Sequence, residues 1–214
     1  SERKDGLRAI RIKDMKTDGD TYIDFNEETY SAYISTNEEY NTNILRYSYS
    51  SMLVPSSVFD YNMDTGEKVL LKQREVPGKG YDKDLYEAKT IYATSRDGKE
   101  KIPIYLVYRK DMKKDGPQPL LLYSYGSYGS TSDPYFSSTR LSLLDRGVIY
   151  ALTNVRGSQI YGRRSYEEGR MLNKKNTFYD FIDAGKFLVS EGYTDPDQLM
   201  CSGGSAGGLL IGAV

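Results

Sequence analysis

The sequence predicts an all-β region followed by an α/β region, and three observations lead to this division. Residues 1–82 contain short stretches of strand-forming residues that recur about every 12 residues, with turn signals between them. From residue 83 onward, continuous apolar runs alternate with helical patterns, which is typical of a mostly parallel sheet. Residues 203–207 read G-x-S-x-G after an apolar segment, as in the strand, turn and helix that present the nucleophile of an α/β-hydrolase. We therefore expect two domains, 1–82 and 83–214, the second being the N-terminal part of an α/β-hydrolase.

The first region is expected to consist of antiparallel strands. Apolar and polar residues alternate in several short stretches, and Asp64-Thr65-Gly66 is a turn signal that predicts a hairpin. This pattern fits a sandwich, a barrel or a propeller blade. The segment 76–80 has the composition of a linker. The predicted strands are 8–12, 30–34, 45–49, 58–61 and 68–72.

The second region combines predicted strands with two predicted helices. Segments 119–123 and 148–152 are continuous apolar runs, as expected of strands buried on both faces, and 90–94 and 102–107 are expected to pair. A helix over 141–147 should end at its glycine. A second helix should begin with a capping box at Thr177 and Asp180 and end at Gly192.

Composition excludes several classes of function. The 214 residues carry a net charge of −1, so nothing indicates a nucleic-acid partner. No apolar run approaches the roughly 18 residues that a membrane span needs. The chain has no histidine and one cysteine, and it has no dinucleotide or phosphate loop, so we expect neither a metal nor a cofactor. A single cysteine favours a reducing compartment, which predicts the cytoplasm.

Ser205 is the candidate nucleophile, and the backbone N–H of Ala206 is a candidate oxyanion donor. Glycines two residues on either side leave room for such a turn, whereas the alternative interpretation is a flexible loop. A hydroxyl needs a neighbouring base, but the chain contains no histidine. Since α/β-hydrolases place the acid and the histidine after the serine, we expect an internal fragment whose parent chain carries both.

A second oxyanion donor should follow an earlier strand. The loop after strand 119–123 offers Tyr123, Tyr125 and Tyr128, and spacing alone does not choose among them. Asp133 after this loop could bind a cationic substrate or simply form a turn before a proline. Cys201 is expected to be a buried strand residue, and the pair at 174–175 to form the surface where a helix begins.

Together these segments resemble the prolyl oligopeptidase family of serine peptidases, and within it the oligopeptidase B branch. The resemblance covers nearly the whole chain, and alanine after the serine points to that branch. The segments that carry it are 31–49, 56–75, 86–110, 119–129, 139–147, 174–180 and 203–208.

The resemblance implies the last blades of a β-propeller over residues 1–82, preceding the hydrolase domain. It implies cleavage of short peptides after Arg or Lys, with Tyr125 as the oxyanion tyrosine and Asp133 in the acidic cluster that binds the P2 residue. Tyr135 replaces the other acid of that pair, and Ile160 replaces a glutamate of the family. The acids that select P1 are expected beyond the end of this chain.

These expectations lead to one main hypothesis, a serine oligopeptidase whose partners are short basic peptides and the rest of its parent chain. Two alternatives remain open. One is a related peptidase or esterase of other specificity, such as an aminopeptidase. The other is a non-catalytic binding protein with a propeller and a degenerate hydrolase domain. The 214 residues alone are expected to be inactive, because they lack the base.

Overall fold

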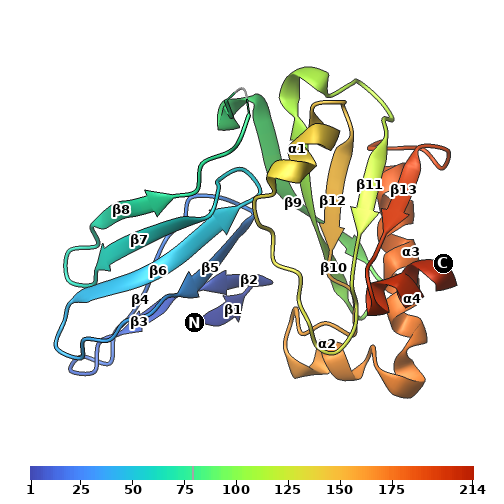
Figure 1. Ribbon diagram of the computed structural model, residues 1–214. Helices are drawn as coiled ribbons and strands as arrows, with labels where there is room; N and C mark the ends of the chain where they lie inside the picture. Colours follow the sequence, from blue (N-terminus) through green and yellow to red (C-terminus); the bar gives the residue numbers. More distant parts are fainter. Residues whose placement is uncertain (79) are drawn as a thin grey trace. The chain divides into compact units, whose positions relative to one another are not determined.

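The structure is a computed structural model that describes residues 1–78 and 80–214. Contacts divide it into two compact units, Ser1–Lys83 with Asp133–Ser137, and Asp84–Ser132 with Ser138–Val214. The predicted linker includes Lys79, which lies outside the described residues. This division reflects contact density, and the predicted domain boundary after residue 82 stays a prediction. Each unit is described by itself below (Figure 1).

The first unit is built from antiparallel strands. Its main sheet has the order β5-β6-β7-β8, and two short hairpins precede it in the chain. The predicted hairpin is confirmed: β7 and β8 pair across a turn in which Gly66 has φ +77°. The strands are β1 (Glu2–Lys4), β2 (Leu7–Ala9), β3 (Arg11–Lys13), β4 (Asp20–Tyr22), β5 (Tyr30–Ile34), β6 (Ile44–Ser51), β7 (Ser57–Asn62) and β8 (Lys68–Gln73).

Aromatic rings form much of the core of this unit. Tyr47 is 1% exposed and stacks on Phe59 with 5.5 Å between ring centroids, and Phe25 stacks on Tyr49 at 5.2 Å. The strand predicted over 8–12 is instead interrupted at Ile10, which is fully buried, so β2 and β3 are separate. The alternating pattern was misleading there because Ile10 joins the two hairpins in the chain and is buried in the same cluster as Tyr47 and Tyr49.

The second unit contains a five-stranded sheet of order β13-β11-β12-β10-β9. β11 is parallel to both of its neighbours, but β10 is antiparallel to both β12 and β9. The sheet is therefore mixed, with its parallel part at one side, rather than mostly parallel as predicted. The strands are β9 (Tyr86–Thr94), β10 (Lys101–Arg109), β11 (Leu120–Tyr123), β12 (Ile149–Thr153) and β13 (Leu199–Ser202).

Helices pack on this sheet and close its core. The long helix α3 packs against β9 and β10, and α4 packs against β13 (Figure 1). Phe181, Ala184 and Leu188 of α3 are buried against strand residues such as Leu122. The helices are η1 (Lys83–Leu85), η2 (Lys110–Met112), α1 (Ser138–Leu144), α2 (Arg163–Glu167), η3 (Met171–Asn173), α3 (Lys175–Ser190) and α4 (Ala206–Ala213).

The predicted start of α3 is wrong, whereas its end is confirmed. α3 begins at Lys175, so Thr177 lies inside the helix and does not cap it. Its hydroxyl instead donates to the carbonyls of Arg156 and Gly169. At the other end, Gly192 has φ +72° and its N–H donates to the carbonyl of Val189. Within residues 1–78 and 80–214, no helix has the length and apolar character needed to cross a membrane.

Candidate active site

Ser205 lies in a sharp turn between a strand and a helix. β13 ends at Ser202 and α4 begins at Ala206, which is the predicted order of elements. Ser205 has φ +53° and ψ −120° and its side chain is exposed. A non-glycine residue in the positive-φ region is strained and persists only where its surroundings enforce it. The hydroxyl is therefore presented on a strained turn at the end of a sheet strand and does not lie in an ordinary loop.

The glycines of the turn are required by close packing of the backbone. A Cβ atom on Gly203 would collide with the carbonyl group of Gly207, 2.7 Å from its carbon. A Cβ atom on Gly207 would lie 2.8 Å from the carbonyl oxygen of Ser124. Both distances are below normal carbon–oxygen and carbon–carbon contacts, and both neighbours are backbone that cannot rotate away. The steric prediction from G-x-S-x-G is thus confirmed.

The sheet brings the loop after β11 to this turn. β11 and β13 are parallel neighbours, and Tyr123 pairs with Ser202 at their carboxyl ends. A Cβ atom on Gly207 would be 3.3 Å from the Cα atom of Tyr125, so Tyr125 packs directly beside the start of α4. Tyr125 is half-buried, whereas Tyr128 is 80% exposed. Of the three candidate tyrosines, Tyr125 is the one whose backbone touches the turn.

Ala206 is the first residue of α4. The first N–H groups of a helix have no acceptor within the helix, and they lie at the positive end of its dipole. The Tyr125 ring lies near the start of the same helix, with its Cδ2 atom 3.6 Å from where a Cβ atom on Gly207 would be. A backbone N–H and a phenol O–H are donors that can stabilise a tetrahedral intermediate. The structure thus brings Ser205, Ala206 and Tyr125 together in one unit.

Asp133 belongs by its contacts to the other unit. Its buried carboxylate forms an ion pair with Arg3 Nη1 at 2.7 Å and accepts hydrogen bonds from Arg8 Nε at 3.2 Å and Tyr33 Oη at 2.5 Å. These donors lie at least 100 residues away in the sequence, so no local pattern could reveal them. The predicted contact between Asp133 and substrate stays a prediction, and a cationic ligand would have to compete with two arginines.

A buried arginine, Arg156, lies in the same unit as Ser205 and was not predicted from the sequence. Arg156 follows β12 and donates to Asp180 of α3 at 2.6 and 2.9 Å and to Asp97 at 2.7 Å. The guanidinium holds the pKa of the Asp97 carboxyl below its usual range by hydrogen bonding. The next residue, Gly157, accepts a hydrogen bond from the N–H of Gly129 at 2.9 Å. The cluster therefore anchors the far end of the Tyr125 loop.

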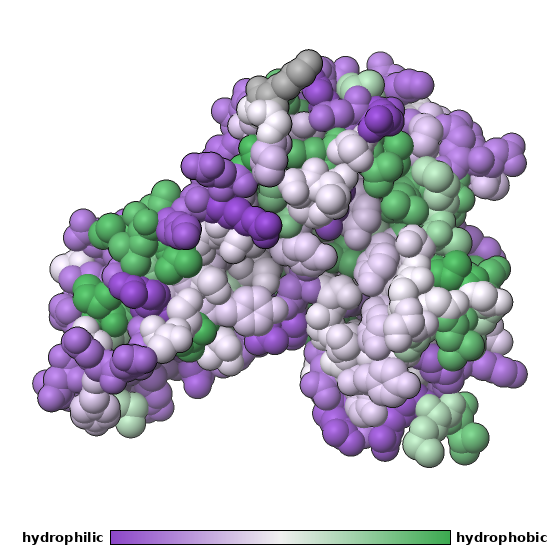
Figure 2. Space-filling model, in the orientation of Figure 1, coloured by the Kyte–Doolittle hydropathy of each residue, from purple (hydrophilic) through white to green (hydrophobic). Residues whose placement is uncertain are grey.

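Two strands, β13 and β8, expose side chains that are usually buried. Cys201 is exposed rather than buried, because β13 is an edge strand of the sheet among the described residues. In the first unit, hydrophobic side chains gather over β8 (Figure 2), where Val69, Leu70 and Leu71 are each about half exposed. Both features mark strands that lack a neighbour on one side in the part of the chain that the structure describes.

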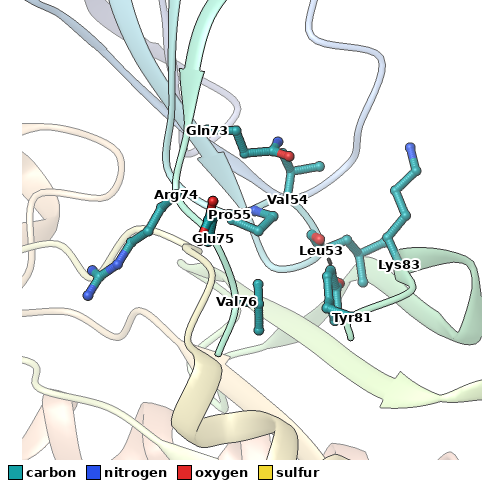
Figure 3. Close-up of a pocket in the computed structure, with 9 residues that line it drawn as sticks. All are labelled: Leu53, Val54, Pro55, Gln73, Arg74, Glu75, Val76, Tyr81 and Lys83. Atoms are coloured by element: carbon teal, nitrogen blue, oxygen red, sulfur yellow. Dashed lines mark hydrogen bonds between the residues drawn. The ribbon is translucent and has the colours of Figure 1, made fainter. Parts of the chain in front are cut away.

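The first unit also contains an open cavity of about 600 Å³, shown in Figure 3. Tyr81 lies at one wall and donates its hydroxyl to the carbonyl of Leu53 at 2.6 Å. Arg74, Glu75 and Lys83 are the charged residues that line it. The cavity contains none of the predicted site residues and combines no nucleophile with a base. It is therefore not a candidate active site.

Comparisons with known proteins agree with this architecture. The model of the "Prolyl oligopeptidase, N-terminal beta-propeller domain" matches residues 1–74, and that of the "Prolyl oligopeptidase family" matches 134–214. Dipeptidyl aminopeptidase BI of Pseudoxanthomonas mexicana is 50% identical over 100% of this chain and 29% of its own length. Protease 2 of Moraxella lacunata is 42% identical over 99% of this chain and 30% of its own length.

Solved structures show the same fold. Oligopeptidase B from Leishmania major matches 99% of this chain with a TM-score of 0.89 and 40% identity, over 31% of its own length. Oligopeptidase B from Trypanosoma brucei matches with the same score and identity. The predicted architecture, a propeller segment followed by part of an α/β-hydrolase domain, is confirmed. The chain spans about a third of the length of the relatives it matches, and it belongs to the prolyl oligopeptidase family.

Proposed function

We propose that this chain is the nucleophile-bearing part of a serine peptidase that hydrolyses short peptides through an acyl-enzyme. The observation that carries the proposal is the strained, exposed Ser205 between β13 and α4. Membership of the prolyl oligopeptidase family supports it. A relative solved with covalently bound antipain supports covalent chemistry in this family. We further propose that the parent chain supplies the aspartate and the histidine, since the chain has no histidine.

In the proposed reaction, Ser205 is the nucleophile, and Ala206 and Tyr125 bind the oxyanion. The Ser205 oxygen attacks the scissile carbonyl carbon, and its proton passes to the histidine of the parent chain. The carbonyl π electrons move to the oxygen, which then accepts hydrogen bonds from Ala206 N–H and Tyr125 O–H. Collapse of this intermediate breaks the C–N bond, and the amine leaves with the proton from the histidine. Water then hydrolyses the acyl-enzyme by the same steps.

Tyr125→Phe in the parent enzyme tests the role of the phenol. Loss of one oxyanion donor typically lowers kcat by about 10²–10³-fold. KM should change little, because the lost hydrogen bond forms with the charged intermediate rather than with the substrate. Steady-state kinetics on a peptide substrate measure both constants, with Tyr128→Phe as the control on the same loop. Unchanged turnover in Tyr125→Phe would contradict the assignment.

For specificity, we propose cleavage after Arg or Lys, supported by the likeness to two structures of oligopeptidase B. The dipeptidyl aminopeptidase with 50% identity favours a second candidate, removal of dipeptides from a free N-terminus. A panel of chromogenic substrates separates the two. N-blocked Arg, Lys and Pro peptides, unblocked dipeptides and a simple ester are compared by kcat/KM. Preference for unblocked dipeptides would replace the first candidate by the second.

The third candidate, a binding protein with a degenerate hydrolase domain, makes a different prediction. Its parent chain would lack the downstream aspartate and histidine, and Ser205→Ala would leave every activity unchanged. Short basic peptides are the partners we propose, with no nucleic acid and no membrane. The cytoplasm is our proposed location, because one cysteine suits a reducing compartment.

A further inference from the structure

We propose that Lys174 is a positioning residue for Tyr125, which deepens the proposed function and rests on it. Sequence reasoning placed Lys174 on an exposed surface where a helix begins. In the structure it is half-buried directly before α3, and its Nζ atom lies beneath the Tyr125 loop. Lys174 would fix the backbone immediately after Tyr125 and so hold the phenol near Ser205.

Two short hydrogen bonds connect Lys174 to this loop. Nζ donates to the carbonyl oxygen of Gly126 at 2.7 Å and to Oγ of Ser127 at 2.7 Å. Ser127 is 9% exposed, so this contact is shielded from water. Among the described residues no carboxylate forms an ion pair with Lys174. Its Nζ atom also lies 5.8 Å from the centre of the Phe178 ring, and both of its hydrogen bonds go to the loop. Hydrogen bonds from a charged donor are roughly twice as strong as neutral ones.

The loop is held on both sides of Tyr125, and Lys174 supplies one side. Before Tyr125, the buried Ser124 donates its hydroxyl to the carbonyl of Thr153 at 2.9 Å. After Tyr125, the side-chain hydrogen bonds to Gly126 and Ser127 come from Lys174, for the part of the chain that the structure describes. Removal of the lysine would therefore take away the side-chain hydrogen bonds directly after Tyr125, and the next hydrogen bond to another segment would be the one from Gly129 N–H to the Gly157 carbonyl.

Packing makes the Gly126 carbonyl a precise anchor. Gly126 has φ +67°, and a Cβ atom there would lie 2.6 Å from Cγ2 of Thr177 and 2.8 Å from Cγ2 of Val155. The backbone thus fits closely between two side chains and has little room to rotate. Burial lowers the pKa of the Lys174 ammonium, and burial of a cation without an acid is costly unless its donors are satisfied. A half-buried lysine at this position therefore suits a structural role in the loop better than a role in solubility.

Lys174→Met in the parent enzyme removes the donors and keeps most of the volume. We expect kcat to fall about tenfold or more with KM within about twofold, because the loss acts through the oxyanion donor. Lys175→Met is the matched control, since Lys175 is exposed and adjacent, and its kcat should not change. The discriminating readout is the double variant. If Lys174 acts through Tyr125, adding Lys174→Met to Tyr125→Phe should cost less than about twofold more.

Three results would overturn the inference. They are an unchanged kcat in Lys174→Met, a loss that multiplies fully with that of Tyr125→Phe, and an equal loss in Lys175→Met. Should Lys174→Met fail to fold, Lys174→Gln takes its place in the same cycle, because it removes the charged donor with a shorter, neutral side chain. A drop in kcat from Tyr125→Phe alone, with no effect at Lys174, would leave the proposed function standing. No effect of Tyr125→Phe would overturn this inference and the oxyanion role of Tyr125, whereas the role of Ser205 is tested separately by Ser205→Ala.

Discussion

At the scale of single residues, the backbone of Ser205 is the informative feature. Its φ of +53° places a side chain where glycine is normally found. Strain of this kind costs about 1–3 kcal/mol and is held in place by surrounding structure. Here the surrounding structure is closely packed backbone, since added Cβ atoms on Gly203 and Gly207 would collide with the carbonyl groups of Gly207 and Ser124. The conformation of Ser205 thus depends on glycines at positions 203 and 207.

Gly207→Ala tests this packing. Its Cβ would press on the Ser124 carbonyl at 2.8 Å and on Tyr125, and overpacking of this kind costs about 1–3 kcal/mol of stability. We also expect kcat to fall, because both the turn and Tyr125 must shift. Gly208→Ala, one residue on, is the control: its Cβ would lie 3.7 Å from the Gly203 oxygen. Thermal unfolding and kinetics of the parent enzyme measure both variants, and equal behaviour would refute the steric argument.

At the scale of elements, Arg156 connects α3 to the sheet of the second unit. Its guanidinium side chain is 2% exposed and that of Asp180 is 0% exposed, so their ion pair is shielded from water. A buried pair need not add net stability, but removal of one partner leaves an uncompensated charge. The same helix also carries a partly exposed pair one turn later, Asp183 with Arg96, whose side chains are 12% and 42% exposed. α3 therefore contributes a carboxylate both to a fully buried and to a partly exposed ion pair.

Asp180→Asn should destabilise the second unit much more than Asp183→Asn. Loss of a buried partner costs about 3–5 kcal/mol, whereas a surface pair such as Asp183 with the half-exposed Arg96 is worth about 1 kcal/mol or less. Urea denaturation of the parent protein, followed by circular dichroism, measures both. Similar midpoints for the two variants would mean that Arg156 is satisfied without Asp180.

Element prediction succeeded where local signals decide and failed where distant residues do. The β7–β8 hairpin and the end of α3 follow from Gly66 and Gly192, whose positive φ serves a local turn. The start of α3 was wrong because Thr177 and Asp180 resemble a capping box but bind Arg156, some 20 residues earlier. Hydrogen-bonding residues near the start of a helix look the same in the sequence whether they cap the helix or bind a distant residue.

At the scale of the whole molecule, the chain carries the proposed nucleophile Ser205 but no histidine. We expect the purified 214 residues to show no turnover of basic peptides, since the chain has no histidine to accept the proton. Circular dichroism must show that the purified chain is folded, and the parent protein serves as the active control. Cleavage of an N-blocked Arg substrate by the folded 214-residue chain, lost in Ser205→Ala, would contradict this view.

The sequence by itself determined the family, the strand–turn–helix around Ser205 and the requirement for small residues there. These follow from spacing over a few residues, because a sharp turn imposes its geometry locally. Only the tertiary structure decided that Tyr125 touches the turn, that Asp133 is paired with Arg3 and Arg8, and that Lys174 supports the loop. Those contacts depend on how strands and helices pack, and they join residues that the chain separates by tens of positions.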